Sequence, residues 1–280
     1  MTWTTWTDAD AAARIRIPSR DDDKYSRGVL GVVTGSATFP GAAVLGVEAA
    51  MRTGVGMVRY LGERAASTEV LRRRPEVVTA AGRVQAWLIG SGVDDEARAD
   101  AAALITDALD SGLPAVLDAG ALPDLRSARD RSSLVITPHA GELSRLLSVF
   151  GRDVSVEDVR REPQTWAVAA ADELGVTVLL KGNTTHIVSA DGTRVRVPEA
   201  TPWLATAGSG DVLGGILGAL LATADDSDDR GLASAATAAL LHDRAARIAS
   251  QGGPIAALDV AEALPAAVRS VLESAHMMNG

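Results

Sequence analysis

The segment Ala205-Thr206-Ala207-Gly208-Ser209-Gly210-Asp211-Val212-Leu213 leads small residues and two glycines directly into an apolar helix. The first amides of a helix have no partner within it, and the helix dipole makes that end positive. Glycines let a phosphate group reach these amides because no Cβ stands in the way. The segment therefore predicts an anion-binding helix terminus. The Asp211 carboxylate either caps this helix, the commonest role of Asp at such a place, or acts as a base.

Ahead of this segment, short apolar runs alternate with stretches of helical periodicity. Because parallel strands are joined by helical crossovers, the alternation predicts a mostly parallel sheet. A proline, Pro163, breaks or kinks the last of these helices. The predicted strands are residues 29–33, 57–61, 86–89, 115–117, 134–136 and 176–180, and the predicted helices are residues 41–52, 95–109, 142–149 and 156–174.

The pattern changes after residue 180. Apolar and polar residues alternate on both sides of the turn pair Asp191-Gly192, which predicts a β-hairpin over 184–188 and 193–197 and an antiparallel edge of the sheet. An acidic run at 225–229 is expected to form a solvated loop. Three further helices are predicted, at residues 211–223, 231–251 and 259–274.

No linker or internal repeat interrupts this order of elements. The sequence therefore predicts a single domain over residues 1–280, an α/β fold in which helices cover both faces of one central sheet. Residues 1–26 are polar and show no clear period, so we expect a loosely packed N-terminal extension.

Composition excludes several classes of protein. With 47% hydrophobic and 22% charged residues, the 280-residue chain can bury a sizeable core. The net charge of −9 argues against a nucleic-acid or anionic-membrane partner. Cysteine is absent, which excludes disulfides and thiolate chemistry. The longest apolar run, 212–222, is too short to span a bilayer, and Asp8 and Asp10 stand where a signal peptide would be basic. We expect a cytoplasmic protein.

Five predicted strands end in residues that suit a binding site. In an open parallel sheet, ligands bind beyond the carboxyl ends of the strands. Asp118 could instead cap a turn, His139 could be a satisfied structural histidine, and Lys181 could be a surface lysine. Lysine is rare here, since Lys24 and Lys181 stand against 25 arginines, and this favours a site role for Lys181. The five segments are Gly35-Ser36, Gly90-Ser91-Gly92, Asp118, Thr137-Pro138-His139 and Lys181-Gly182-Asn183-Thr184.

Other binding and catalytic motifs are missing. The sequence has no phosphate loop of the G-x-x-x-x-G-K-[ST] type, no third glycine of the dinucleotide fingerprint, no G-x-S-x-G elbow and no H-E-x-x-H. The four histidines show no ligand spacing. We therefore expect no metal held by the protein itself; a divalent ion such as Mg²⁺ would arrive with nucleotide phosphates.

Together these segments resemble the ADP-dependent NAD(P)H-hydrate dehydratases, a branch of the ribokinase-like superfamily. The resemblance covers about Lys24 to Leu272. Gly-Ser-Gly-Asp alone would indicate the superfamily, and Thr-Pro-His-x-Gly-Glu selects the branch. The segments that carry it are Gly35-Ser36 with Pro40-Gly41-Ala42-Ala43, Thr137-Pro138-His139-Ala140-Gly141-Glu142, Lys181-Gly182-Asn183-Thr184-Thr185 and Leu204 to Leu213.

This resemblance implies a ribokinase-like three-layer sandwich that repairs damaged nicotinamide cofactor. Hydrated NADH or NADPH, in the (6S) form, would be dehydrated to NADH or NADPH while ADP is converted to AMP and phosphate. The resemblance also implies a homo-oligomer, a tetramer, and a separate epimerase as a possible partner enzyme, since the chain leaves no room for an epimerase domain. It places the hydrated dinucleotide at Ala42, Gly92, His139 and Asp211, with Asp211 as the catalytic base, and the adenylate at Lys181, Gly182, Asn183, Thr184, Thr185 and Gly210.

Two departures and two alternatives remain open. Asp23 stands where relatives often have His, and Thr201-Pro202-Trp203 replaces a frequent Asn, which puts substrate contacts in doubt rather than mechanism. A ribokinase-like small-molecule kinase would use Asp211 in the same way but leave phosphate on its product. A nucleotide sensor would not need Asp211 beside Gly210. The sequence does not decide between ADP and ATP, between NADH and NADPH hydrates, or the oligomeric state.

Overall fold

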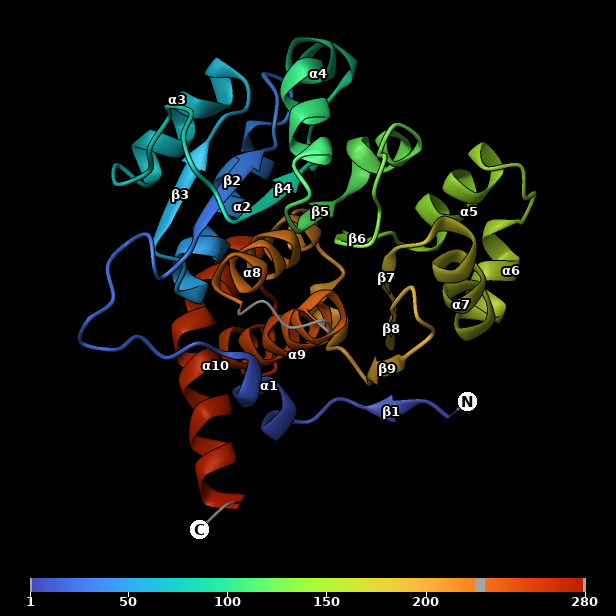
Figure 1. Ribbon diagram of the computed structural model, residues 1–280. Helices are drawn as coiled ribbons and strands as arrows, with labels where there is room; N and C mark the ends of the chain where they lie inside the picture. Colours follow the sequence, from blue (N-terminus) through green and yellow to red (C-terminus); the bar gives the residue numbers. More distant parts are fainter. Residues whose placement is uncertain (1, 225–229, 279–280) are drawn as a thin grey trace.

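The protein is described by a computed structural model over residues 2–224 and 230–278, so the acidic run 225–229 lies outside the described residues. Their strands form one sheet in the order β1-β9-β8-β7-β6-β5-β4-β2-β3 (Figure 1). From β3 to β7 neighbouring strands are parallel, and β8 is antiparallel to β7 and β9. The strands are β1 (Thr4–Thr5), β2 (Val29–Val33), β3 (Met57–Tyr60), β4 (Ala86–Ile89), β5 (Ala115–Leu117), β6 (Leu134–Ile136), β7 (Thr177–Leu180), β8 (Thr185–Val188) and β9 (Arg194–Val197).

Helices cover both faces of this sheet (Figure 1). On one face, α8 packs on β2, β4 and β5, and α9 packs on β6 to β9. The helices on this face are α1 (Asp8–Arg14), α2 (Pro40–Thr53), α3 (Arg64–Arg73), α8 (Ser209–Thr223), α9 (Arg230–Ser250) and α10 (Ala257–Met278). The helices on the other face are α4 (Asp95–Asp110), the 3-10 helix η1 (Ala119–Arg126), α5 (Ala140–Val149), α6 (Val156–Arg161) and α7 (Pro163–Leu174).

The central strands are apolar on both sides because each side faces a helical layer. Leu30 and Val32 of β2 pack into the core under α8, whereas Val29 and Val33 pack into the opposite core. Side chains alternate across a strand, so a continuous apolar run buries both faces. The three-layer α/β/α architecture predicted from the sequence is therefore confirmed.

Glycine lets α8 lie directly against α2. A Cβ on Gly215 would stand 2.2 Å from the Gly46 carbonyl oxygen, so no larger residue fits without moving a helix. This close contact places the first turn of α8 beside the carboxyl ends of β2 and β4. The segment 205–213 thus enters the sheet edge where the other predicted loops end.

The expected N-terminal extension differs from the structure. Residues 4–14 are not loosely packed: β1 pairs with β9, and α1 is capped by Thr7 and packs on α9 and α10. The Trp6 indole donates to Thr237 at 3.2 Å, and Arg244 donates to Asp8 at 2.8 Å. Two- and seven-residue elements are too short to show a period, which is why sequence pattern missed them.

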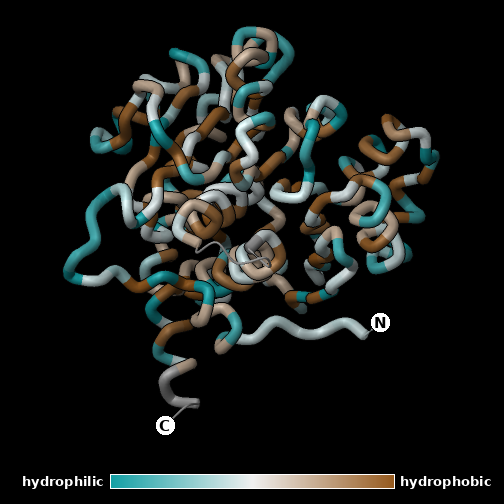
Figure 2. Tube along the Cα trace, viewed as in Figure 1, coloured by the Kyte–Doolittle hydropathy of each residue, from teal (hydrophilic) through white to brown (hydrophobic). Residues whose placement is uncertain are grey.

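The segment between α1 and β2 is hydrophilic and lies at the outside of the molecule, whereas the strands and α8 form an apolar interior (Figure 2). The predicted helix 156–174 is two helices, α6 and α7, because Pro163 begins the second. No helix in the described part of the chain is long and apolar enough to cross a membrane.

Candidate active site

The five loop segments predicted to share a site meet at one edge of the sheet. Strand order reverses between β2 and β4, since β3 lies outside β2, and ligands bind at such a switch point. Each loop is hydrogen-bonded to its neighbour. The Gly35 amide donates to the Ser91 carbonyl at 2.7 Å, the Thr137 hydroxyl donates to Asp118 at 2.8 Å, and the Lys181 amide donates to the Pro138 carbonyl at 2.9 Å.

The first turn of α8 has free amide groups. Gly208 precedes the helix with φ of +87°, a left-handed backbone conformation that favours glycine. Glycine has no side chain that could cap the helix. Among the described residues, the amides of Gly210 and Asp211 donate to no hydrogen-bond acceptor. Two unpaired amides at the positive end of a 15-residue helix form a ready anion-binding site.

Asp211 is not the cap of this helix. It is the third residue of α8, and its Oδ1 accepts a hydrogen bond from the hydroxyl of Ser91, which follows β4. Burial raises the pKa of the Asp211 carboxyl; the Ser91 hydrogen bond lowers it, the Asp118 carboxylate raises it and Lys181 lowers it, with the net shift upward. A raised carboxyl pKa is the direction that a general base needs near neutral pH.

Lys181, directly after β7, lies between two carboxylates. Its Nζ is 3.0 Å from Asp118 Oδ1 and 3.6 Å from Glu142 Oε2. Burial alone would lower the pKa of Lys181, but the two carboxylates raise it above its ordinary value, so the side chain is a cation. The Asp118 carboxylate itself is buried and makes no cap bond to η1, which excludes the turn-cap interpretation.

His139 has a structural role and a position at the site. Its Nδ1 accepts hydrogen bonds from the amides of Gly141 and Glu142, at 3.0 and 3.2 Å, and so caps α5. Because Nδ1 is an acceptor here, the neutral ring carries its proton on Nε2. Half of the side chain is exposed, and the ring lines the main cavity, where this N–H can serve as a donor.

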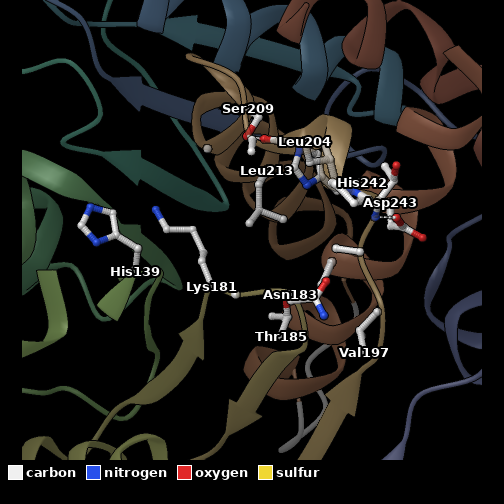
Figure 3. A pocket seen from close by; sticks show the side chains of 17 residues that line it. His139, Lys181, Asn183, Thr185, Val197, Leu204, Ser209, Leu213, His242 and Asp243 are labelled. Atoms are coloured by element: carbon white, nitrogen blue, oxygen red, sulfur yellow. Dashed lines mark hydrogen bonds between the residues drawn. The ribbon is translucent and has the colours of Figure 1, made fainter. Parts of the chain in front are cut away.

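The main cavity, of about 520 Å³, lies beyond β7, β8 and β9 and against α8 and α9. In Figure 3 the Lys181 side chain points toward His139 at one end, with Asn183 and Thr185 below and His242 and Asp243 on the facing helix. One wall is apolar and the end near Lys181 is polar. The lining residues are His139, Lys181, Gly182, Asn183, Thr185, Val197, Ala200, Thr201, Pro202, Leu204, Ala205, Ser209, Gly210, Leu213, Ala239, His242 and Asp243.

The structure divides the predicted site residues into three groups. Six of them line the main cavity, whereas Thr184 lines a smaller neighbouring cavity of about 280 Å³. Ala42 and Gly92 lie together at the switch point: Gly92 has φ of +66°, and a Cβ on it would stand 2.5 Å from the Ala42 Cβ. Asp211 connects the two regions, since it touches Ser91 on one side and follows Gly210 on the other.

Sequence reasoning missed the cavity residues of α9. His242 is buried, and burial lowers its pKa to about 4, so the ring is neutral near neutral pH. Its Nε2 has no hydrogen-bond partner in the described structure. Asp243 fixes the loop after β9, because its Oδ1 accepts from the Thr201 amide at 2.7 Å. The sequence feature that could have revealed these residues is a His-Asp pair within an alanine- and leucine-rich helix.

The mostly parallel sheet with helices on both faces is the ribokinase-like fold, since a ribokinase-like protein of Enterococcus faecalis superposes on the chain with a TM-score of 0.83 at 20% identity. A family model described as NAD(P)H-hydrate dehydratase matches residues 30–266. The chain belongs to that family.

Three similar proteins illustrate the match. The bifunctional NAD(P)H-hydrate repair enzyme of Mycobacterium tuberculosis is 47% identical over 226 residues, 76% of this chain and 45% of that protein. The ADP-dependent (S)-NAD(P)H-hydrate dehydratase of Neisseria meningitidis is 35% identical over 89% of this chain and 86% of that protein. The crystal structure of the ADP/ATP-dependent dehydratase of Bacillus subtilis, co-crystallised with ATP and Mg²⁺, superposes with a TM-score of 0.82 at 24% identity, covering 97% of this chain and 99% of the other. The chain spans about half the length of the bifunctional relatives it matches.

Proposed function

We propose that the protein dehydrates the (6S) hydrate of NADH or NADPH, consuming ADP and releasing AMP and phosphate. The observation that carries this proposal is the Asp211 carboxylate, which is half-buried, does not cap its helix and lies beside the free amides at the start of α8. A base and an anion hole at one point suit phosphoryl transfer to a hydroxyl. The name of the Neisseria meningitidis relative supports the choice of ADP and of the hydrate.

In the proposed reaction the hydrate's hydroxyl attacks the terminal phosphorus of ADP. Asp211 accepts the hydroxyl proton as the new O–P bond forms and the bond to AMP breaks. The free amides at the start of α8 stabilise the charge on the transferred phosphoryl group. The C–O bond then breaks, and phosphate departs with its electron pair. Loss of a proton from the adjacent ring carbon restores the double bond of the reduced nicotinamide.

The proposal assigns the two regions of the site to the two substrates. The adenylate occupies the main cavity along Lys181, Gly182, Asn183, Thr185 and Gly210, and Thr184 supports this loop from the smaller cavity. The hydrated ring lies toward Ala42, Gly92 and His139, which leaves Asp211 between hydroxyl and phosphate. The departure at Asp23 lies ahead of β2, at the opposite edge of the sheet, away from both regions.

Incubation with hydrated NADH and ADP, followed by near-ultraviolet absorbance, tests this function. We expect absorbance of the reduced dinucleotide to return only when nucleotide is present. Parallel reactions with ATP, and with hydrated NADPH, determine the preference for each substrate. No recovery with either nucleotide would reject the dehydratase.

Replacing Lys181 by Ala should weaken ADP binding by about 1.5–3 kcal/mol, because a charge-assisted contact to phosphate is lost. Calorimetric titration with ADP measures the change. Lys24→Ala is the matched control, since Lys24 is the chain's other lysine and is exposed before β2, at the far edge of the sheet. Equal ADP affinity in the wild type and both variants would contradict the assignment of Lys181.

Mg²⁺ would arrive with the nucleotide and neutralise part of its phosphate charge. Among the described residues, no group of three or more His, Asp or Glu side chains is arranged to hold a metal ion. Phosphate oxygens and water would therefore supply most ligands, which fits an ion delivered by ADP. Co-crystallisation of the Bacillus subtilis dehydratase with ATP and Mg²⁺ supports this pairing of nucleotide and ion.

We also propose a homotetramer acting in the cytoplasm, with an epimerase as a possible separate partner enzyme. These features follow from resemblance to the family. Light scattering measures the mass in solution, and a monomeric mass would reject the assembly.

A further inference from the structure

Lys181 and Asp211 have opposite charges and border the same point of the site, yet they form no ion pair in the described structure. The Lys181 Nζ lies 3.6 Å from the position that a Cβ on Gly210 would occupy, and Gly210 precedes Asp211. An ammonium so near a base would pair with it unless other groups held it. A carboxylate paired with an ammonium accepts a proton less readily, because its pKa is lowered.

Two carboxylates hold the ammonium instead. Asp118, at the end of β5, is 3% exposed, and its Oδ1 lies 3.0 Å from Lys181 Nζ. The Thr137 hydroxyl donates to the same oxygen at 2.8 Å and fixes its position. Glu142 lies in the first turn of α5, and its Oε2 is 3.6 Å from Lys181 Nζ. The same oxygen accepts a hydrogen bond from the His139 amide at 2.8 Å.

We propose that Asp118 is a positioning residue: with Glu142 it holds the Lys181 ammonium beside Gly210 and prevents it from pairing with Asp211. This inference rests on the proposed function, in which Asp211 must be free to accept a proton and Lys181 must be free to meet phosphate. Segments that follow four strands thus supply the groups around the two charges. Ser91, after β4, donates a hydrogen bond to the Asp211 carboxylate. Lys181, after β7, is held by Asp118, after β5, and by Glu142, after β6.

The charges around Asp211 support this assignment. The charged groups that face it are Asp118 and Lys181, while His139 and His242 border the main cavity beside Lys181. Asp118 raises the pKa of Asp211, and Lys181 lowers it. Removing the Asp118 charge therefore acts twice in one direction, since it deletes a like charge and frees Lys181 to approach Asp211.

The test is the titration of the Asp211 carboxyl in ligand-free protein, followed by carbon NMR of labelled aspartate and assigned by its loss in Asp211→Asn. In Asp118→Asn we expect the pKa of Asp211 to fall by about one to three units, the range produced by an opposite charge at close distance. The acid limb of the pH–turnover profile should move down equally. Asn keeps an oxygen that accepts from Thr137, which favours folding.

Glu142→Gln is the matched control, because it removes the other carboxylate near Lys181 but keeps the α5 cap and leaves Asp118 in place. Because Asp118 lies nearer to Lys181 Nζ than Glu142 does, at 3.0 against 3.6 Å, the pKa of Asp211 should fall much less in Glu142→Gln than in Asp118→Asn. In the double variant Asp118→Asn/Lys181→Met the fall should be smaller than in Asp118→Asn alone, since no ammonium can approach.

An unchanged Asp211 titration in Asp118→Asn would overturn the proposal, even where hydrate turnover in the wild type upholds the function. An equal fall in the single and double variants would also overturn it, because Lys181 would then play no part. Conversely, a protein without turnover that still shows the expected titrations would reject the proposed function and keep the charge arrangement.

Discussion

Replacing Asp211 by Asn should lower turnover of the hydrated dinucleotide by about 10²–10⁴-fold, the usual contribution of a positioned base. Thermal stability and ADP affinity should stay at the wild-type level. Asn retains an oxygen that can accept the Ser91 hydrogen bond, but it cannot take a proton from the substrate. The free amides at the start of α8 are unchanged by the substitution, so phosphate binding should persist.

Asp10 provides the matched control for this variant. It is the third residue of α1, as Asp211 is of α8, but its carboxylate accepts from the Thr7 amide at 2.9 Å and so belongs to a cap. Asp10→Asn should be nearly silent, since the Asn side chain keeps an oxygen that can accept from the Thr7 amide at this exposed helix end. Steady-state rates and melting temperatures of both variants make the comparison. If Asp211→Asn also kept the wild-type rate, Asp211 would have no role as base.

The largest expected loss of stability follows the substitution Glu48→Gln. Glu48 of α2 is fully buried, and Arg52, Arg73 and Arg74 contact its carboxylate at 2.6, 3.1 and 2.5 Å. Removing one partner of a buried ion pair typically costs about 3–5 kcal/mol of unfolding free energy. Because the arginines reach solvent, we expect the lower end of that range, about 3 kcal/mol. Urea unfolding at neutral pH measures the loss.

The pH dependence of Glu48 has a definite sign. Burial raises its pKa, but hydrogen bonds from the three arginines outweigh burial and lower it from 4.5 to about 2. A carboxyl with a lowered folded-state pKa stabilises the protein above its unfolded pKa, and this contribution is lost as the pH falls from about 4.5 to about 2. The stability difference between wild type and Glu48→Gln should shrink over that interval.

The matched control for Glu48 is Glu69→Gln, which removes an exposed ion pair with Arg72 on α3. Exposed pairs contribute about 0–1 kcal/mol, so its unfolding midpoint should change little at any pH. A Glu48→Gln protein as stable as Glu69→Gln would mean that the buried charge cluster contributes nothing to joining α2 and α3.

Periodicity and turn chemistry were sufficient to predict the layers of the fold. Apolar runs such as Val29–Val33 are buried on both faces, and Gly35, Ser91 and Asp118 follow strands that are parallel, so their meeting at one edge could be foreseen. Pro163 marked the break between α6 and α7. By contrast, α3 was not predicted, because four arginines and one glutamate over 64–74 obscure its apolar side, where Ala66 and Val70 are buried.

Contacts between distant side chains could not be predicted from one sequence. Asp211 looked like an N-cap by its local sequence, and the structure excludes that role because its carboxylate turns to Ser91, 120 residues away. The same holds for Lys181, whose partners Asp118 and Glu142 come from two other loops. His242 joins the cavity through the packing of α9 on β7, β8 and β9, which no local pattern encodes.

The most direct test of the account is the stoichiometry of one reaction, in which hydrated NADH and ADP are mixed with the protein and AMP, inorganic phosphate and NADH are counted together. The account predicts equal amounts of the three products, because each transferred phosphoryl group leaves again with the hydroxyl oxygen. A stable phosphate ester of the hydrate, formed with AMP but without recovered NADH or free phosphate, would contradict it and identify the protein as a kinase.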